Sequence, residues 1–142
     1  MHHIEQITQE LTWKIRQKEL NPELRLAAIK LPEDDLGIHL GLFHNNKLIT
    51  VVSLFEYGEV LQFRKFATDS EHQKMGFGKQ MMEYILAYAE EHHFIRVWCN
   101  ARCSASGFYE KFGFTETEER FSKNGIDYVI MEKYIYDTAP LP

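Results

Sequence analysis

A long amphipathic segment set between two strand-like runs is the feature that most constrains this fold. Residues 79–92 repeat apolar side chains at helical spacing, with Met82 and Ile85 on one side. The runs before and after it, 60–68 and 94–100, have the composition of strands. Strands joined through a helix lie parallel when they pair in one sheet. The sequence therefore predicts one parallel pair of strands.

The other strand-like runs are joined by short turns and predict antiparallel pairing. Asparagine and glycine in such turns are hairpin signals, because both residues tolerate a left-handed backbone. The turns are Asn45-Asn46 and Lys123-Asn124-Gly125, which separate runs 38–42 from 48–55 and 115–122 from 126–134. We predict an α+β, or mixed α/β, fold in which helices cover a mostly antiparallel sheet.

The first forty residues carry weaker signals. Residues 4–7 read as a short strand, and helical spacing from Thr8 predicts a helix that ends at Asn21-Pro22, since proline disfavours a helical residue before it. Residues 24–29 predict a second short helix, and residues 32–35 a polar loop.

Bulk composition narrows the class of protein. A chain of 142 residues suits one domain, and we expect residues 1–136 to form it and residues 137–142 to be a flexible tail. No apolar run is long enough to cross a membrane and no secretory signal is present, so we expect a cytoplasmic protein with no membrane partner. A net charge of −5 argues against nucleic acid as a partner. Cys99 and Cys103 are expected to be free thiols.

The segment Gln73–Lys79 lies between a predicted strand and the long helix. Amides that open a helix lack intrahelical partners, and glycines let the backbone approach an anion closely, so such a loop can hold a diphosphate. The P-loop pattern is excluded, because Gln80 follows Lys79, and the dinucleotide pattern is excluded by Met81. On these residues alone, a plain turn between strand and helix explains the glycines equally well.

The loop and a second block together resemble the Gcn5-related N-acetyltransferase (GNAT) superfamily. Gln73-x-x-Gly76-x-Gly78 is similar to its Gln/Arg-x-x-Gly-x-Gly/Ala signature. Residues 105–114, Ala-Ser-Gly-Phe-Tyr-Glu-Lys-Phe-Gly-Phe, are similar to its Ala-x-x-Phe-Tyr-x-Lys-x-Gly-Phe block. The resemblance implies the GNAT acyl-CoA N-acyltransferase fold: a twisted, mostly antiparallel sheet with helices on both faces and a parallel strand pair that forms the cofactor cleft.

The same resemblance implies acetyl-CoA as co-substrate, with no metal. It assigns the signature loop to the CoA diphosphate and the preceding strand end to the pantetheine arm and the thioester carbonyl. It also assigns an asparagine at the end of the next strand to the cofactor. The residues are Gln73, Lys74, Met75, Gly76, Phe77, Gly78 and Lys79; Phe66, Ala67 and Thr68; and Asn100. For Asn100, a turn or cap role is the alternative.

Tyr109 matches the tyrosine that the family uses as general acid to the leaving CoA thiolate. The implied reaction is direct transfer of an acetyl group to a primary amine on a small molecule or peptide, by an enzyme of the acyltransferase class. A core aromatic residue is the alternative for Tyr109. For the whole protein, the alternative is a sensor of the same fold that binds acyl-CoA without turnover.

The acceptor side is the least readable part of the sequence. Some relatives carry a glutamate base at the position of Gln62, and glutamine cannot act as a base, so Glu56, Glu59, His39 or a chain of waters remain open. Strand alternation places Arg64 on one face with Gln62 and Phe66, where Arg64 could hold a substrate carboxylate or pair with an acid of the chain. Dimers are common in the family, so a homodimer is one option.

Overall fold

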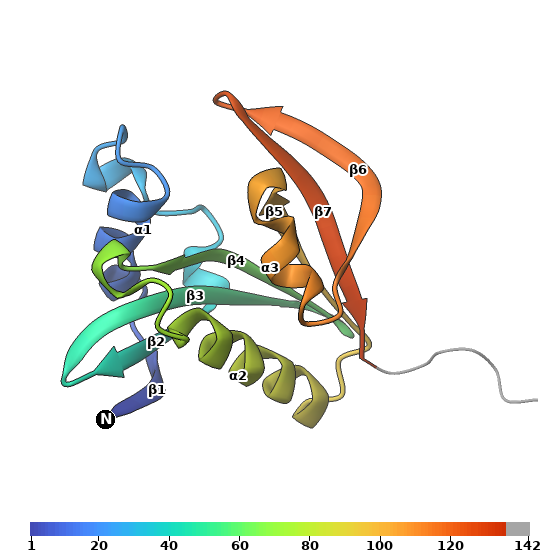
Figure 1. The fold of residues 1–142 in the computed structure, drawn as a ribbon, viewed down its shortest axis with the longest axis horizontal. Helices are drawn as coiled ribbons and strands as arrows, with labels where there is room; N and C mark the ends of the chain where they lie inside the picture. Colours follow the sequence, from blue (N-terminus) through green and yellow to red (C-terminus); the bar gives the residue numbers. More distant parts are fainter. Residues whose placement is uncertain (136–142) are drawn as a thin grey trace, which may run out of the picture. The chain divides into compact units, whose positions relative to one another are not determined.

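The computed structural model describes residues 1–135 as two compact units, and the tail predicted for residues 137–142 lies outside them. Unit 1 comprises Met1–Phe55 and Phe63–Ile85. Unit 2 comprises Glu56–Gln62 and the described chain from Leu86 onward. Strands β3 and β4 and helix α2, labelled in Figure 1, each contain residues of both units.

Strands and helices follow the predicted order closely. The strands are β1 (His2–Ile7), β2 (Ile38–His44), β3 (Lys47–Tyr57), β4 (Val60–Thr68), β5 (Arg96–Arg102), β6 (Thr115–Lys123) and β7 (Ile126–Tyr134). The α-helices are α1 (Trp13–Glu19), α2 (Phe77–Glu91) and α3 (Ser106–Glu110). Short 3₁₀ turns cover Gln9–Thr12, Leu26–Ala28, Asp34–Leu36, Ser70–His72 and Cys103–Ala105.

The predicted strand pairing is confirmed. The seven strands are ordered β1-β2-β3-β4-β5-β7-β6, and β4 pairs parallel with β5 from Val60 opposite Arg96 to Gln62 opposite Trp98. The β1–β2, β2–β3, β5–β7 and β6–β7 pairs are antiparallel. The predicted mixed α/β fold is therefore confirmed, with its one parallel pair formed by the two strands that α2 connects.

Both hairpin turns also form as predicted. Asn45 and Asn46 have φ of 51° and 66° between β2 and β3, and Asn124 and Gly125 have φ of 53° and 76° between β6 and β7. Two consecutive left-handed residues match the twist of the flanking strands, which is why asparagine and glycine occur there.

The N-terminal predictions need three corrections. The helix expected from Thr8 begins as the 3₁₀ turn Gln9–Thr12 and becomes α-helical only at Trp13. The helix expected at 24–29 is only a 3₁₀ turn, because three residues between an extended Arg25 and Ile29 are too few for an α-helix. The polar loop expected at 32–35 runs into the 3₁₀ turn Asp34–Leu36, and Asp34 within it is only 1% exposed.

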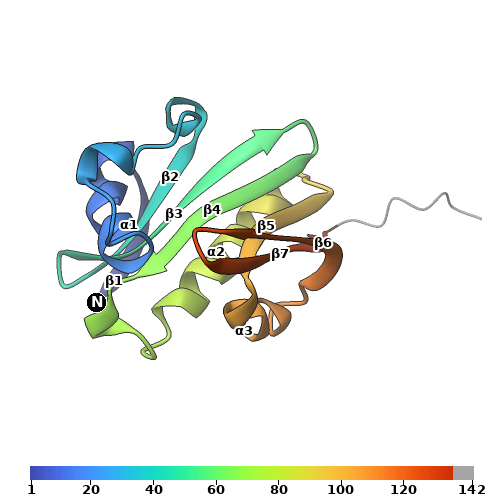
Figure 2. The same cartoon turned by 90° about the horizontal axis from the view of Figure 1, so that it is seen from above.

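The core of unit 1 joins α1 to the sheet. Ile15 of α1 packs with Val51 of β3 and Ala67 of β4, and Ile7 and Leu20 pack against this cluster. Figure 2 shows α1 lying over the strands of this unit. The side chain of Ala67 is therefore part of the core, which leaves only its backbone for a ligand.

Candidate active site

The end of β4 carries an irregularity that bears on its function. Lys65 has φ of 56°, a left-handed conformation that side chains rarely adopt within a strand. The Phe63 and Phe66 rings, three residues apart, lie 6.0 Å from each other in an edge-to-face contact, whereas a regular strand would send them to opposite faces. The expectation that Phe66 shares a face with Arg64 is therefore not met, because alternation breaks at Lys65. Irregularities of this kind are common beside active sites, where they re-aim neighbouring groups.

Side chains tie the last residue of β4 to its neighbours. The Thr68 hydroxyl lies 3.0 Å from the Thr50 hydroxyl of β3, and the Thr68 carbonyl accepts a hydrogen bond of 3.1 Å from Gln73 Nε2. Gln73 thus closes the loop back onto the strand end. The first residue of the predicted signature acts here through its side chain, as a brace of the loop.

Asp69 anchors the start of the loop to α1. Its carboxylate accepts from Lys18 Nζ at 2.5 Å and contacts His72 Nδ1 at 2.8 Å, while Glu19 accepts from the Ser70 N–H at 2.7 Å. Hydrogen bonds from Lys18 and then His72 lower the pKa of Asp69 to about 2. Nothing in the sequence indicated this anchor, because Lys18 and Glu19 precede the loop by about fifty residues.

The loop itself turns on two left-handed residues, Lys74 with φ of 63° and Gly76 with φ of 86°. A Cβ added to Gly76 would meet no atom within 4 Å, so open space adjoins this residue. Alternation of this kind aims successive amides to one side and forms an anion-binding concavity. Figure 1 shows the loop running directly into α2.

Helix α2 begins with unused amides. Its hydrogen-bond ladder starts with the Gln80 N–H donating to the Gly76 carbonyl at 3.1 Å. Within residues 1–135, the structure gives the N–H groups of Phe77, Gly78 and Lys79 no acceptor. The Phe77 side chain is buried, with its ring 5.0 Å from that of His44, so only its backbone can face a ligand. Partial positive charge at the helix start favours an anion there.

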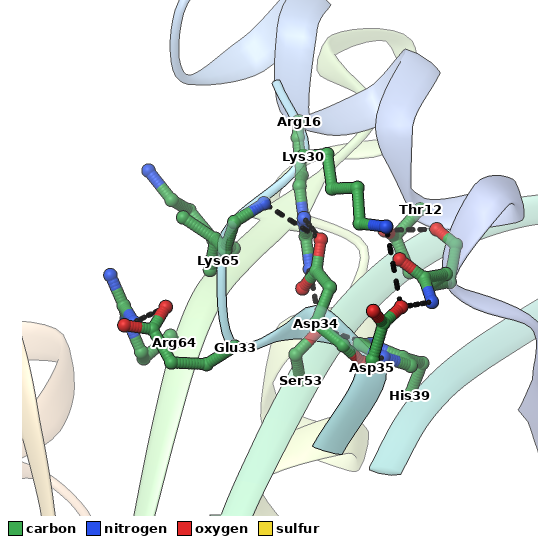
Figure 3. Close-up of polar contacts among 12 residues, drawn as sticks. Thr12, Arg16, Lys30, Glu33, Asp34, Asp35, His39, Ser53, Arg64 and Lys65 are labelled. Carbon is green, nitrogen blue, oxygen red and sulfur yellow. Dashed lines mark hydrogen bonds and ion pairs between the residues drawn. The ribbon is translucent and has the colours of Figure 1, made fainter. Parts of the chain in front are cut away.

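A buried polar network holds the loop that precedes β2 (Figure 3). Arg16, 1% exposed, donates to both carboxylate oxygens of Asp34 at 2.8 and 2.9 Å and to the Ser53 hydroxyl at 2.8 Å. Burial by itself raises the pKa of Asp34, but hydrogen bonds from Arg16 and from the Leu31 N–H outweigh burial and bring that pKa below its ordinary value. No local sequence pattern indicated this network.

His39 belongs to the same network, which bears on the search for a base. Its Nε2 lies 2.9 Å from the Asp34 carbonyl oxygen and its Nδ1 lies 2.7 Å from the Ser53 hydroxyl. The ring is buried, and both of its nitrogens are occupied. His39 therefore has a structural role and is not an available base.

Arg64 pairs with an acid of the chain. Its Nη1 donates to Glu33 Oε2 at 3.2 Å, and its guanidinium lies 5.8 Å from the centre of the Phe55 ring. Figure 3 shows Glu33 reaching Arg64 from the loop that Arg16 and Asp34 anchor. Of the two roles considered for Arg64, the structure contains the ion pair, and a substrate carboxylate would have to displace Glu33.

In unit 2, Tyr109 lies on α3 among aromatic rings. The rings of Phe108 and Phe114 lie 5.2 and 6.2 Å from the Tyr109 ring, and both contacts are edge-to-face. Burial, and then the nearby Cys99 thiol, raise the pKa of Tyr109 above its ordinary value. The phenol is therefore protonated throughout the physiological range and can donate a hydrogen bond.

The end of α3 is set by Gly113, as its left-handed φ of 91° requires. Lys133 of β7 donates to the carbonyl of Phe112 at 2.6 Å and so caps the helix. A Cβ on Gly113 would lie 2.5 Å from Lys133 Nζ, so glycine serves both the turn and the cap.

The remaining candidates of unit 2 have different environments. Asn100 is exposed on β5 opposite Ile130 of β7, and Gln62 is 6% exposed opposite Trp98. The Glu56 carboxylate accepts a short hydrogen bond from the Tyr88 hydroxyl. The Glu59 backbone carbonyl accepts from the Ile95 N–H at 2.8 Å. None of these contacts singles out a base.

Two other kinds of feature have no counterpart in residues 1–135, a metal site and a membrane-spanning helix. No three or more His, Cys, Asp or Glu side chains among them are arranged to hold a metal ion. No helix in this part of the chain is long and apolar enough to span a membrane.

A family model described as an acetyltransferase (GNAT) domain matches residues 30–135, which is most of the chain. The chain belongs to the GNAT acetyltransferase family. This GNAT protein is an acyltransferase enzyme, as the motifs of its loop and of α3 predicted.

A curated relative agrees with that assignment, and solved structures agree with the fold. The chain is 29% identical to the uncharacterized N-acetyltransferase YitI of Bacillus subtilis (strain 168), over 94% of this chain and 96% of YitI. Its fold matches the ribosomal-protein-S18-alanine N-acetyltransferase of Escherichia coli with a TM-score of 0.79 at 18% identity, covering 98% and 97% of the two chains. It also matches a GNAT acetyltransferase of Elizabethkingia anophelis with acetyl-CoA bound, with a TM-score of 0.74 at 18% identity over 94% and 97%.

Proposed function

We propose that this enzyme transfers the acetyl group of acetyl-CoA directly to a primary amine, with the amides that open α2 holding the CoA diphosphate and Tyr109 acting on the leaving sulfur. The observation that carries the proposal is the start of α2. There, left-handed Gly76 adjoins open space and the amides of Phe77, Gly78 and Lys79 have no acceptor within residues 1–135. An anion with several oxygens satisfies such amides and the helix dipole together.

The reaction follows from these assignments. The deprotonated amine attacks the thioester carbonyl carbon, the new C–N bond forms, the C–S bond breaks, and the departing sulfur takes the proton of the Tyr109 hydroxyl. The nitrogen loses a proton to solvent as the amide forms, and a proton from solvent returns the Tyr109 phenolate to the neutral phenol. Backbone amides of Phe66, Ala67 and Thr68 are assigned to the pantetheine arm and the carbonyl oxygen, where one such donor typically contributes about 3 kcal/mol.

The raised pKa of Tyr109 poses a question of driving force, because a weak acid gives up its proton reluctantly. The Cys99 thiol shows how burial in unit 2 acts on sulfur: it raises the pKa of Cys99 to about 12 and keeps the thiol neutral at physiological pH. The same loss of water would make a CoA thiolate leaving in buried surroundings more basic. The two shifts thus run in the same direction, which keeps proton transfer feasible.

The diphosphate assignment is tested by Gly76→Ala with Gly58→Ala as matched control. Both glycines are left-handed, with φ of 86° and 61°, and neither has an atom within 4 Å of an added Cβ. We expect similar losses of stability in both variants, but a loss of CoA affinity only in Gly76→Ala, measured by calorimetry. Equal CoA affinity in the two variants would remove the loop from the cofactor site.

The role of Tyr109 is tested by Tyr109→Phe, with exposed Tyr57→Phe as control. General acid catalysis contributes about 100-fold or more, so we expect kcat to fall by that factor while CoA affinity is kept. Release of free thiol from acetyl-CoA with a panel of amines provides the measurement. If CoA binds but no amine promotes thiol release in the unaltered protein, the chain is a sensor and not a transferase.

A further inference from the structure

A hollow on unit 2 has no part in the transfer chemistry described above. Its volume is about 320 Å³, and its walls come from the turn before α3 and from the β6–β7 hairpin. The lining residues are Cys103, Arg120, Phe121, Ser122, Asp127 and Tyr128. Polar and aromatic side chains from two segments therefore converge on one space, and their chemistry limits what can occupy it.

The positive charge in this hollow is already neutralised. Arg120 Nη2 donates to Glu116 at 2.8 Å, and Arg120 Nη1 lies 3.9 Å from Cys103 Sγ. The pairing of β6 with β7 is irregular between Glu116 and Arg120, which allows the two side chains to meet. Arg120, and with it Ser106 at the start of α3, lower the pKa of the Glu116 carboxyl. Arg120 thus braces the wall and contributes little net charge.

The negative charge is not neutralised. Asp127 Oδ1 accepts from the Ser122 hydroxyl at 2.5 Å, and no atom of residues 1–135 pairs with its other oxygen. Beside it, the Phe121 and Tyr128 rings stack with centres 5.0 Å apart and planes 12° apart, and Phe121 is 40% exposed. A carboxylate next to a partly exposed aromatic pair favours a cation, which an ion pair and the outer face of a ring attract together.

We propose that this hollow binds a protonated amino group of the acceptor, so that the preferred acceptors are α,ω-diamines; this inference rests on the proposed amine acetylation. The attacking amine must be neutral, so the ammonium group in the hollow is the second amine of the same molecule. The geometry of unit 2 suits such a molecule. Tyr128 pairs with Arg102 at the end of β5, and from Cys103 the chain runs through one 3₁₀ turn into α3. At the rise per residue of these helices, the chain from Cys103 to Tyr109 spans roughly 10 Å.

Three probes of matched length test the class of acceptor. They are 1,7-diaminoheptane, n-heptylamine, which lacks the second cation, and 7-aminoheptanoic acid, which replaces it with an anion. We expect the diamine to have the lowest KM for thiol release and the amino acid the highest. A KM for heptylamine as low as that of the diamine, or a preference for the amino acid, would overturn the proposal.

Substitutions place the effect in the hollow. Asp127→Asn should raise the KM for the diamine about three- to fivefold and leave the KM for heptylamine unchanged, the size expected for an exposed ion pair with aromatic support. Phe121→Leu should produce a smaller rise. Glu118→Gln removes the same charge from an exposed residue of β6 that does not line the hollow, and it should change neither KM. Equal effects of Asp127→Asn and Glu118→Gln would show a general charge effect and sink the proposal.

Direct binding separates this inference from the proposed function. Titration of 1,7-diaminoheptane into the protein without acetyl-CoA, followed by NMR, should perturb the signals of Phe121, Asp127 and Tyr128, and Asp127→Asn should weaken binding. Binding without thiol release would retain the hollow and overturn the transferase proposal. Thiol release with no diamine preference and no binding in the hollow would retain the transferase and overturn the hollow.

Discussion

The two units hold their candidate functional groups by different physical means. Unit 1 uses backbone groups and buried charge. The backbone groups are left-handed Gly76 and the amides that open α2, and the buried charges are the Arg16–Asp34 ion pair that holds the loop before β2. Unit 2 uses burial. Tyr109 lies against an aromatic ring, and exclusion of water raises the pKa values of Tyr109 and of the Cys99 thiol.

This difference shows where each unit is vulnerable. A buried ion pair adds little net stability but is costly to break, because the remaining partner becomes an uncompensated buried charge. The stability of a buried aromatic cluster is less sensitive to loss of one polar group, because many weak contacts share the stabilisation. The following experiments compare matched changes in the two units.

The largest effect is expected for Asp34→Ala in unit 1. It leaves Arg16 buried without its partner and should lower the free energy of unfolding by about 3–5 kcal/mol in urea titrations. The matched change in unit 2 is Glu132→Ala, which breaks the 2.6 Å pair with Arg96, where both side chains are about one-quarter exposed. That change should cost about 1 kcal/mol. Similar losses in both variants would contradict the comparison.

Alanine at two glycines should give a smaller contrast. Gly113→Ala in unit 2 forces a left-handed alanine and displaces Lys133 from the α3 cap, so we expect a loss of about 2 kcal/mol. Gly76→Ala in unit 1 has the strain without the clash and should cost about 1 kcal/mol. Thermal unfolding measures both. If Lys133→Met restored no part of the Gly113→Ala loss, the clash would not be its cause.

The units should also respond at opposite ends of the pH scale. The pKa of Asp69 in the folded protein is lowered to about 2. Its contribution to folding stability is therefore complete above the unfolded pKa near 4 and is lost as the pH falls toward 2. The folded pKa of Tyr109 is raised, so its contribution is complete below its unfolded value near 10 and is lost as pH rises further.

Midpoints of thermal unfolding across pH test this contrast. Asp69→Asn should flatten the acid limb alone and Tyr109→Phe the alkaline limb alone. Glu71→Gln, at an exposed neighbour of Asp69, serves as control and should leave the acid limb unchanged. If the unfolding midpoint of Asp69→Asn still fell steeply at low pH, other carboxylates would be responsible for the acid limb.

The smallest effect is expected at the two hairpin turns. Asn46→Gly converts the β2–β3 turn of unit 1 to the Asn-Gly pair found in unit 2 and should stabilise by about 0.5 kcal/mol. Gly125→Asn makes the reverse change in unit 2 and should destabilise by a similar amount. Urea titrations of both variants are the measurement, and changes of the same sign would show that the turns are not equivalent.

Local patterns carried most of the fold prediction. The crossover through α2 and the turns at Asn45-Asn46 and Asn124-Gly125 each depend on residues close together in the chain, so spacing and backbone preference were enough. The first helix was less predictable, because Gln9–Thr12 has helical spacing but forms a 3₁₀ turn. Left-handed Lys65 gave no signal, since lysine is not a residue that prefers this conformation.

The sequence by itself determined the order of strands and helices, the parallel pair, the loop opening α2 and the family to which these belong. Each of these follows from periodicity, glycine and motifs that act over a few residues. Only the tertiary structure decided that Arg16 meets Asp34 and Ser53, that Lys18 meets Asp69, and that Glu33 meets Arg64. Those partners lie 18 to 51 residues apart, and a charged side chain carries no local mark of which distant partner the fold will bring to it.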